Sequence, residues 1–225
     1  MRVITTDDGS HSLYVPHLDE TYHSSFGAIT ESEHIFIESG LHHFCHSNPQ
    51  ASQVSIFELG FGTGLNALLS YRYALQTHIE VKYISIESDP LPLDFAMTLN
   101  YPALIDFKGS GDIFRALHES SWDQTIQLVE FFSIKKIHRP VEHFEGQQDM
   151  VEVIYFDAFA PGIQPAIWSR EILQMMFDMI KVGGVLVTYC VQGQFRRDLK
   201  AVGFHVEKLP GPPGKREIVR AVKTE

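Results

Sequence analysis

The sequence predicts an α/β fold, a doubly wound parallel sheet with an antiparallel hairpin at one edge. From residue 54 onward, apolar segments of strand length alternate with segments of helical periodicity. This alternation implies a parallel sheet whose two faces are covered by right-handed crossovers. Near the C-terminus, two strand-like segments follow one another across the turn Pro-Gly-Pro-Pro-Gly at 210–214, which favours an antiparallel pair.

The first forty residues are expected to form a small β-rich extension. Thr-Thr-Asp-Asp-Gly-Ser at 5–10 is typical of a hairpin turn, and His34–Glu38 has the pattern of a short strand. We therefore divide the chain into an N-terminal extension, residues 1–50, that packs on a main domain, residues 51–225.

The main domain yields an ordered set of elements. The expected strands are 54–58, 81–87, 126–137, 153–157 and 185–190, followed by a closing pair at 203–208 and 217–222. The expected helices are 65–76, 91–99, 165–181 and 195–202, and residues 102–125 are expected to be irregular or weakly helical.

The histidine-rich stretch Leu-His-His-Phe-Cys-His-Ser at 41–47 is expected to be a short polar helix. Four potential metal ligands within five residues cannot all converge on one ion, so no metal site is predicted there.

Composition favours one globular domain with a sizeable core, since 44% of the 225 residues are hydrophobic and 20% are charged. No apolar run approaches the ~18–20 residues of a membrane span, and the N-terminus lacks the basic and apolar regions of a signal peptide. The two cysteines, Cys45 and Cys190, are far apart and suggest no disulfide framework. These features predict a cytoplasmic protein without a membrane segment.

The charge is unevenly distributed. The net charge of −10 argues against a protein that coats nucleic acids generally. Residues 191–225 hold 8 Lys and Arg against 4 Asp and Glu, a net of +4, whereas residues 1–190 hold 10 against 24, a net of −14. The basic segment is equally compatible with a solvated face and with a surface that meets phosphates.

Three alternating glycines follow the first strand of the main domain, in the pattern Glu58-x-Gly60-x-Gly62-x-Gly64. A dinucleotide fingerprint has the spacing G-x-G-x-x-G, but here the third glycine comes one residue early and Leu65 takes its place. The pattern suits a ligand without pyrophosphate whose ammonium group meets a carboxylate. S-adenosylmethionine is such a ligand, and NAD is the alternative.

Acidic residues end three predicted strands, namely Glu58, Glu87 and Asp157. Ligands of doubly wound sheets bind beyond the carboxyl ends of the strands, so these three acids are expected to line one crevice. Glu87 is placed to accept hydrogen bonds from two ribose hydroxyls. Because a glycine loop alone is weak evidence, the three acids strengthen the prediction of a cofactor site.

A second motif is more specific. The stretch IYFDAFAPGIQPAIWSREILQMM at 154–176 resembles the methyltransferase half of the MnmC family, bifunctional enzymes that complete 5-methylaminomethyl-2-thiouridine at the tRNA wobble position, and their stand-alone relatives. The family's entry, glycine-loop, second-strand and closing segments are similar to ITESEHIFIESGL, ELGFGTGLNALL, YISIESDPL, FRRDLKAVGF and PGKREI. The similarity covers most of residues 20–222.

The resemblance implies a Rossmann-like class I methyltransferase that uses S-adenosyl-L-methionine. It implies conversion of 5-aminomethyl(-2-thio)uridine to 5-methylaminomethyl(-2-thio)uridine, with the tRNA anticodon loop as partner. The implied catalytic residues are Asp157, Phe159 and Tyr22; the cofactor-binding residues are Glu58, Gly60, Gly62, Gly64, Asn66, Glu87 and Asp157; the substrate-binding residues are Glu31, Arg196, Arg197, Lys215 and Arg216.

The sequence departs from the family pattern at two places. Ala158 stands where bifunctional members usually carry Gly, and His138-Arg139 falls where relatives tend to carry a Gly-Asp pair that touches adenine. Asp112 in the imitation Ser-Gly-Asp-Ile is too far upstream of Asp157 to replace that pair. Since the chain ends at residue 225, the FAD-dependent oxidase half is expected to be absent, and a separate oxidase is a possible supplier of the aminomethyl group.

Two other classes of function remain open. One keeps S-adenosylmethionine but acts on another amine or on a protein, which would suit the negative net charge. The other is a nucleotide-binding module or an NAD oxidoreductase on the same fold.

Overall fold

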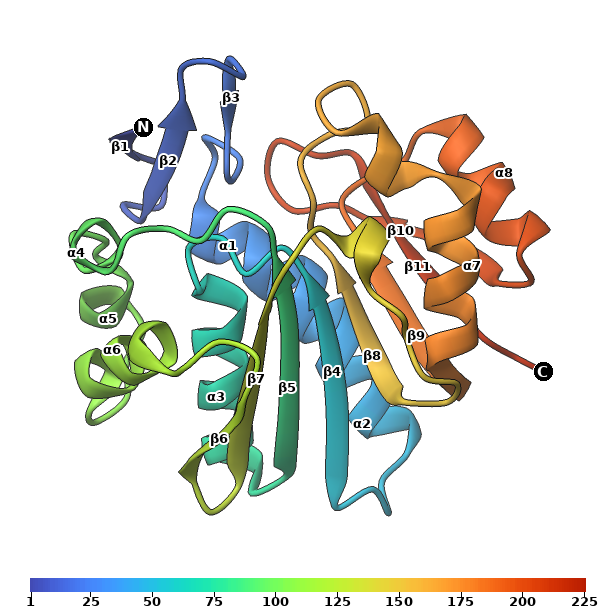
Figure 1. Cartoon of the computed structure of the whole chain (residues 1–225), viewed down its shortest axis with the longest axis horizontal. Helices are drawn as coiled ribbons and strands as arrows, with labels where there is room; N and C mark the ends of the chain where they lie inside the picture. Colours follow the sequence, from blue (N-terminus) through green and yellow to red (C-terminus); the bar gives the residue numbers. More distant parts are fainter.

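A computed structural model describes all 225 residues, and its centre is an eight-stranded sheet of order β10-β11-β9-β8-β4-β5-β7-β6 (Figure 1). The five parallel strands are β4 (Gln53–Leu59), β5 (Glu80–Glu87), β7 (Phe132–His138), β8 (Val151–Phe156) and β9 (Ile180–Thr188). β11 (Glu217–Val222) is antiparallel to β9 and to β10 (His205–Pro210). The predicted α/β class and the edge hairpin are confirmed.

Helices cover both faces of this sheet (Figure 1). One face carries α3 (Leu65–Thr77), the short helices α4 (Leu93–Ala96) and α5 (Tyr101–Leu104), and α6 (Ser110–Glu119). The other face carries η3 (Pro165–Trp168), α7 (Arg170–Met179) and α8 (Gly193–Ala201), while the single turn η2 (Val141–His143) follows β7. None of the helices has the length and apolar character that crossing a membrane would require.

The N-terminal fifty residues are only partly β-structured. β1 (Arg2–Thr5), β2 (His11–Val15) and β3 (Glu20–Thr21) form a separate small sheet. They are followed by one helical segment, made of α1 (Ala28–Ser32), the π-helix η1 (Glu33–His42) and α2 (His43–Ser47). The short helix expected at the histidine-rich stretch is thereby confirmed, and the division at residue 50 stays a prediction.

The strand predicted at His34–Glu38 is wrong, because these residues lie within η1. Ile35, Phe36 and Ile37 are all buried, since η1 packs against both α3 and the sheet. A helix covered on several sides carries consecutive apolar residues, and a short apolar run of this kind cannot be told from a buried strand by its period.

Other elements also differ from the sequence prediction. Residues 102–125, expected to be irregular or weakly helical, contain the regular ten-residue helix α6. The strand expected over 126–137 is a hairpin of β6 (Thr125–Val129) and β7 that turns at Glu130 and Phe131. Because Phe131 is apolar, the strand-like pattern of the sequence continues through the turn. The helix expected over 165–181 is divided at Ser169, whose side chain accepts a hydrogen bond from Ile172 N and caps α7. β9 begins at Ile180, so Gly183–Gly184 lies inside the strand rather than before it.

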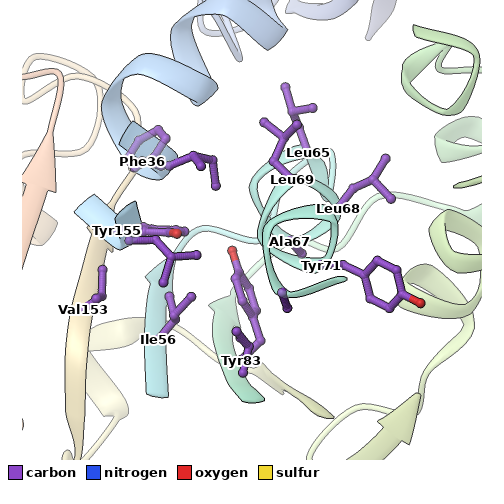
Figure 2. Close-up of a cluster of buried hydrophobic side chains, with 14 of the residues drawn as sticks. Phe36, Ile56, Leu65, Ala67, Leu68, Leu69, Tyr71, Tyr83, Val153 and Tyr155 are labelled. Carbon is purple, nitrogen blue, oxygen red and sulfur yellow. The ribbon is translucent and has the colours of Figure 1, made fainter. Parts of the chain in front are cut away.

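Side chains on the central strands alternate between two hydrophobic cores. Val54 and Ile56 of β4 face α3 and η1, whereas Phe57 and Leu59 face α7. Tyr83 of β5 and Tyr155 of β8 point to the same side as Ile56, and Phe36 of η1 packs onto them (Figure 2). The same alternation directs the acids at the strand ends toward α3.

Gly40 sets how closely η1 approaches the sheet. A Cβ atom at this position would lie 2.9 Å from Val187 Cγ2 and 3.4 Å from Tyr155 Cε1. The valine is stiff at its branch point, so an added methyl group must displace the helix.

We predict that Gly40→Ala lowers the free energy of unfolding by ~1–3 kcal/mol, as overpacking of a core does. Gly111→Ala is the matched control, because the space around Gly111 in α6 is open. This control is expected to be neutral or stabilising by up to ~1 kcal/mol. Urea unfolding measures both, and equal stabilities of the two variants would contradict the prediction.

Candidate active site

A cavity of about 650 Å³ lies at the carboxyl ends of β4, β5, β7 and β8. Its walls come from the glycine loop after β4, from Glu87–Asp89, from Arg139–Glu142 and from Asp157–Ala160. The N-terminal segment adds Tyr22 to Ser24, and the loop between β10 and β11 adds Lys215. The volume is in the range of small-molecule sites.

The glycine loop depends on backbone angles that other residues rarely adopt. Gly60, Gly62 and Gly64 have φ values of 92°, 48° and 73°. A Cβ at Gly60 would lie 3.1 Å from the carbonyl oxygen of Asp157, and one at Gly62 would lie 3.1 Å from Tyr22 Cε1. The glycines therefore allow two other segments to approach the loop.

Glu87 forms one wall of the cavity, as predicted. Its Oε2 accepts a hydrogen bond from Gly62 N at 3.0 Å and its Oε1 accepts one from Asp89 N at 2.9 Å. Both oxygens retain a free lone pair, so the carboxylate is held in place and can still accept hydrogen bonds from a ligand.

Glu58 does not line the cavity, so the prediction that three strand-end acids line it is wrong for this residue. The side chain is buried beneath the glycine loop, and Ser85 Oγ donates to its Oε2 at 2.7 Å. Burial raises the pKa of Glu58 to about 8. Glu58 lies level with Ser85 and Tyr155, two residues before Glu87 and Asp157, so its side chain stays inside the sheet beneath the loop.

Asp157 faces the cavity directly after β8. Asn66, in the first turn of α3, donates from Nδ2 to Asp157 Oδ2 at 2.8 Å. Burial raises the pKa of Asp157 to about 7, and the nearby carboxylate of Glu31 acts in the same direction, whereas Asn66 and Lys215 act against it. A carboxyl group in this setting can exchange a proton near neutral pH.

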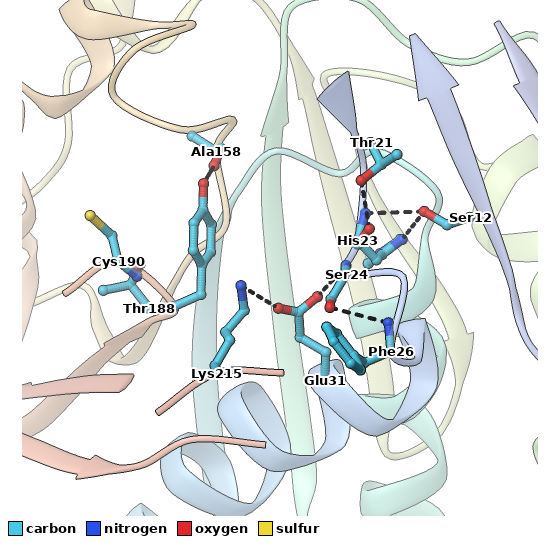
Figure 3. Close-up of polar contacts among 11 residues, drawn as sticks. Ser12, Thr21, His23, Ser24, Phe26, Glu31, Ala158, Thr188, Cys190 and Lys215 are labelled. Carbon is cyan, nitrogen blue, oxygen red and sulfur yellow. Dashed lines mark hydrogen bonds and ion pairs between the residues drawn. The ribbon is translucent and has the colours of Figure 1, made fainter. Parts of the chain in front are cut away.

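Glu31 and Lys215 connect distant parts of the chain across the cavity (Figure 3). Glu31 Oε1 lies 3.1 Å from Lys215 Nζ, and Glu31 Oε2 accepts from Ser24 N at 2.7 Å. Lys215 Nζ also lies 4.9 Å from the ring centre of Tyr189, whose hydroxyl donates to Ala158 O at 2.8 Å. Glu31 therefore lines the cavity, although it comes from helix α1 rather than from the end of a strand.

Tyr22 and Phe159 meet edge to face over the cavity, with ring centres 5.0 Å apart and an interplanar angle of 73°. Trp168 Nε1 donates to Phe159 O at 2.8 Å and fixes the backbone there. Trp168 itself is buried against Phe156 and Phe195, so it is a core residue, whereas Phe159 is a wall of the cavity.

The predicted basic residues are divided by the structure. Lys215 lines the cavity, but Arg196, Arg197 and Arg216 do not. Arg197 donates to Gln194 Oε1 at 2.7 Å, and Arg196 Nε donates to Val191 O at 3.2 Å, so both lie on α8 outside the cavity.

The structure also separates His138 and Arg139, the two residues that form the second departure from the family pattern. Arg139 lines the cavity, whereas the ring of His138 lies against Trp122. Asp112 is exposed on α6 and does not line the cavity, as expected for an imitation of the motif.

Sequence reasoning missed several lining residues, among them Tyr189 and Glu142. Tyr189 directly follows β9, and the strand-end rule used for the acids would have found it. Glu142 lies in the turn η2, whose sequence carries no comparable signal.

Comparisons with known proteins agree with this geometry. Residues 118–224 match a family model described as S-adenosyl-L-methionine-dependent methyltransferase. The tRNA 5-methylaminomethyl-2-thiouridine biosynthesis bifunctional protein MnmC of Pseudoalteromonas atlantica is 28% identical over 221 residues, which cover 91% of this chain and 31% of that protein. The MnmC protein of Magnetococcus marinus is 29% identical, over 93% of this chain and 32% of its own length.

The matched segment, just under half of the chain, is thus similar to the S-adenosyl-L-methionine-dependent methyltransferases. The chain spans about a third of the length of its MnmC relatives. Among solved structures, MNMC2 of Aquifex aeolicus superposes with a TM-score of 0.79 at 23% identity, and the match covers 100% of this chain and 71% of that one. The shared fold is the class I methyltransferase fold expected from the sequence.

The two buried acids predict how stability changes with pH. Between the usual carboxyl pKa near ~4.3 and the raised values, the folded protein holds protons that the unfolded chain releases. Stability from this source is fully present at low pH and is lost as the pH rises through about 7 and 8.

We therefore expect Glu58→Gln to reduce the fall in unfolding free energy between pH 5, just above the usual carboxyl pKa, and pH 9, about one unit above the raised pKa of Glu58. The exposed Glu130→Gln is the control and should keep the wild-type profile. Urea unfolding at several pH values measures this, and an equally steep fall in Glu58→Gln would contradict the assignment.

Proposed function

We propose that this protein transfers a methyl group from S-adenosylmethionine to the primary amine of 5-aminomethyl(-2-thio)uridine at the tRNA wobble position. The observation that carries the proposal is the placement of Asp157, a partly desolvated carboxyl group facing a cavity between the glycine loop and two aromatic rings. The MnmC relatives, which their names assign to tRNA 5-methylaminomethyl-2-thiouridine biosynthesis, support the choice of substrate.

The lining of the cavity fits the proposed cofactor. A Cβ atom at position 60 or 62 would crowd Asp157 O or Tyr22 Cε1, each at 3.1 Å, so the glycines let both residues lie beside the loop at the cavity. The acidic walls, with Glu87 and Asp89 on one side, suit a ligand that carries an ammonium group and a positively charged sulfur. Bound S-adenosylmethionine supplies an electrophilic methyl group. Gly60, Gly62, Gly64, Asn66, Glu87 and Asp157 would hold it, and Glu58 would support the loop from beneath.

Asp157 would orient the substrate amine and accept its proton. An alkylammonium has no lone pair and a pKa near ~10, so it must lose a proton before or during attack. The burial that raises the pKa of Asp157 to about 7 also disfavours the charged ammonium and so lowers the pKa of the substrate amine. The pKa values of the carboxyl group and the amine are therefore closer together than in water. Asn66 holds the carboxyl in position, and alignment in such a site is worth up to ~7–11 kcal/mol in favourable systems.

Tyr22 and Phe159 would stack on the uracil ring after it leaves the anticodon stack, as bases in enzyme pockets commonly do. Glu31 would accept a hydrogen bond from the same nucleotide while its other oxygen keeps Lys215 in place. The enzyme would thus use one carboxylate for chemistry and another for positioning.

Four basic residues would meet the phosphates of the anticodon loop: Lys215 on the cavity wall, and Arg196, Arg197 and Arg216 outside it. All four belong to the segment of net charge +4. A tRNA substrate implies a cytoplasmic protein, and a separate oxidase would supply the aminomethyl group.

The net charge of −10 favours one alternative, a small amine or a protein as methyl acceptor. Incubation with labelled S-adenosylmethionine and tRNA bearing the aminomethyl group tests the choice. Transfer to the wobble uridine supports the proposal. Transfer that is independent of RNA and of salt would assign the substrate to the alternative, and calorimetric binding of NAD without S-adenosylmethionine would remove both.

We predict that Asp157→Asn lowers the single-turnover rate on this tRNA by ~10²–10⁴-fold, the usual range for loss of a general base. The wild-type rate should rise with pH through about 7, and the variant should lack this inflection. Glu20→Gln removes a carboxylate that β3 contributes to the same cavity and is the control, with a small expected effect. An unchanged rate in Asp157→Asn, or an equal loss in the control, would count against the assigned role.

We also predict that Arg196→Ala and Arg216→Ala each weaken tRNA binding and reduce the slope of log affinity against log salt by ~0.7–0.9. Lys181→Ala is the control, because this lysine pairs with Glu152 at the opposite end of the sheet. Filter binding over a salt series gives the slopes, and identical slopes for all variants would exclude phosphate contacts at α8 and the β10–β11 loop.

A further inference from the structure

Phe26 is an aromatic side chain at the rim of the cavity with 49% of its surface exposed. Of the large hydrophobic side chains that are exposed in this structure, it is the only aromatic one. Ser24, two residues before it, lines the cavity. The position is therefore open to solvent and directly next to the proposed active site.

The ring is held against the loop between β10 and β11. A Cβ on Gly214 would lie 2.1 Å from Phe26 Cδ2, so the ring packs on the bare backbone of this glycine. Gly214 has a φ of 82°, which a residue with a side chain rarely adopts. One side of the ring therefore rests on the loop and the rest of its surface is free.

The support beneath Phe26 is rigid. Its backbone N–H donates to Ser24 Oγ at 3.3 Å, and Glu31 joins Ser24 to Lys215 (Figure 3). Within the loop, Gly211 N donates to Arg216 O at 3.2 Å and Lys215 N donates to Pro212 O at 2.9 Å. A ring presented in this way loses little conformational entropy when it binds a partner.

The charges next to Phe26 are mixed, and two arginines among them form no ion pair. Lys215 and Arg216 follow Gly214 directly, and Lys215 is paired with Glu31. Asp8 lies beside Gly27, the residue after Phe26. The ion pair with Lys208 lowers the pKa of Glu217, and the positive charges of Arg216 and Arg196 act in the same direction, so both arginines lie near Glu217. Arg216 and Arg196 thus offer a polyanion a basic surface near the loop that carries Phe26.

We propose that Phe26 is a stacking platform for the nucleotide base next to the methylated uridine, with Lys215 and Arg216 holding the adjoining phosphates. The proposal rests on the proposed tRNA substrate. When the target base enters the cavity, its neighbour loses a stacking partner, and an exposed aromatic face at the rim replaces it. An exposed ring beside basic side chains is the combination by which proteins bind single-stranded RNA.

The test uses the full chain and an anticodon stem-loop that carries 5-aminomethyluridine. Methyl transfer is measured with the intact RNA and with RNAs that lack one base, on either side of the target nucleotide. The variants are Phe26→Ala, Phe26→Leu, which keeps an apolar contact to Gly214, and Phe26→Tyr, which keeps the aromatic face. Leu104→Ala removes an exposed apolar side chain on α5 and is the control.

Phe26→Ala and Phe26→Leu are expected to raise the KM for intact RNA about tenfold, within the range for base–aromatic stacking. Phe26→Tyr and Leu104→Ala should keep the wild-type KM, and calorimetric affinity for S-adenosylmethionine should be unchanged in all four. Removing one flanking base should raise the KM of the wild type by a similar factor and change that of Phe26→Ala little.

The proposed stacking role would be overturned by an unchanged KM in Phe26→Ala. It would also be overturned if removing a flanking base raised the KM of the wild type and of Phe26→Ala equally. A protein partner would then remain as the occupant of this rim. Failure of the wild type to methylate any of these RNAs would instead refute the proposed function, so the two failures are distinguishable.

Discussion

The left-handed backbone of three alternating glycines is the constraint on which the rest of the site depends. Because positions 60 and 62 carry no Cβ, the carbonyl of Asp157 and the ring of Tyr22 reach the loop from two other parts of the chain. Glu87 closes the arrangement by accepting a hydrogen bond from the loop itself. Strand β4 alone does not make a site; the loop makes one by letting β5, β8 and the N-terminal segment converge on it.

Desolvation then gives the converging carboxyl groups different tasks. Glu58 lies beneath the loop with a pKa near 8 and is protonated at neutral pH, which suits a support rather than a charge. Asp157 faces the cavity and has a pKa of about 7, so its charge changes near neutral pH. Under the proposed function, this carboxyl group lies beside the methyl acceptor, which must lose a proton. Two carboxyl groups near neighbouring strand ends therefore differ in role because the register places Glu58 two residues deeper in the sheet than Asp157.

Much of the site could be predicted because it follows from period and position. Alternation along the strands places Asp157 and Glu87 at one edge, and the glycine spacing marks the loop between them. The burial of Glu58 was not predictable, since it depends on the register in which β4 pairs with β5 and β8.

The errors in the fold have similar origins. The run Ile35–Ile37 is apolar on all sides because η1 lies between other elements, and no local pattern separates that from a strand. The hairpin turn at Glu130 and Phe131 contains neither glycine nor proline, so the sequence carries no turn signal there. Tertiary packing, rather than local propensity, determines both the helix at Ile35–Ile37 and the turn at Glu130 and Phe131.

The ion pair between Glu31 and Lys215 joins residues from opposite ends of the sequence. Contacts of such long range form late, because the loop they close is almost the whole chain. During synthesis the sheet can begin to assemble while the last strands are still inside the ribosome, but the cavity stays incomplete until they emerge. Under the proposed function, the nascent chain cannot bind its ligands before its last strands have folded.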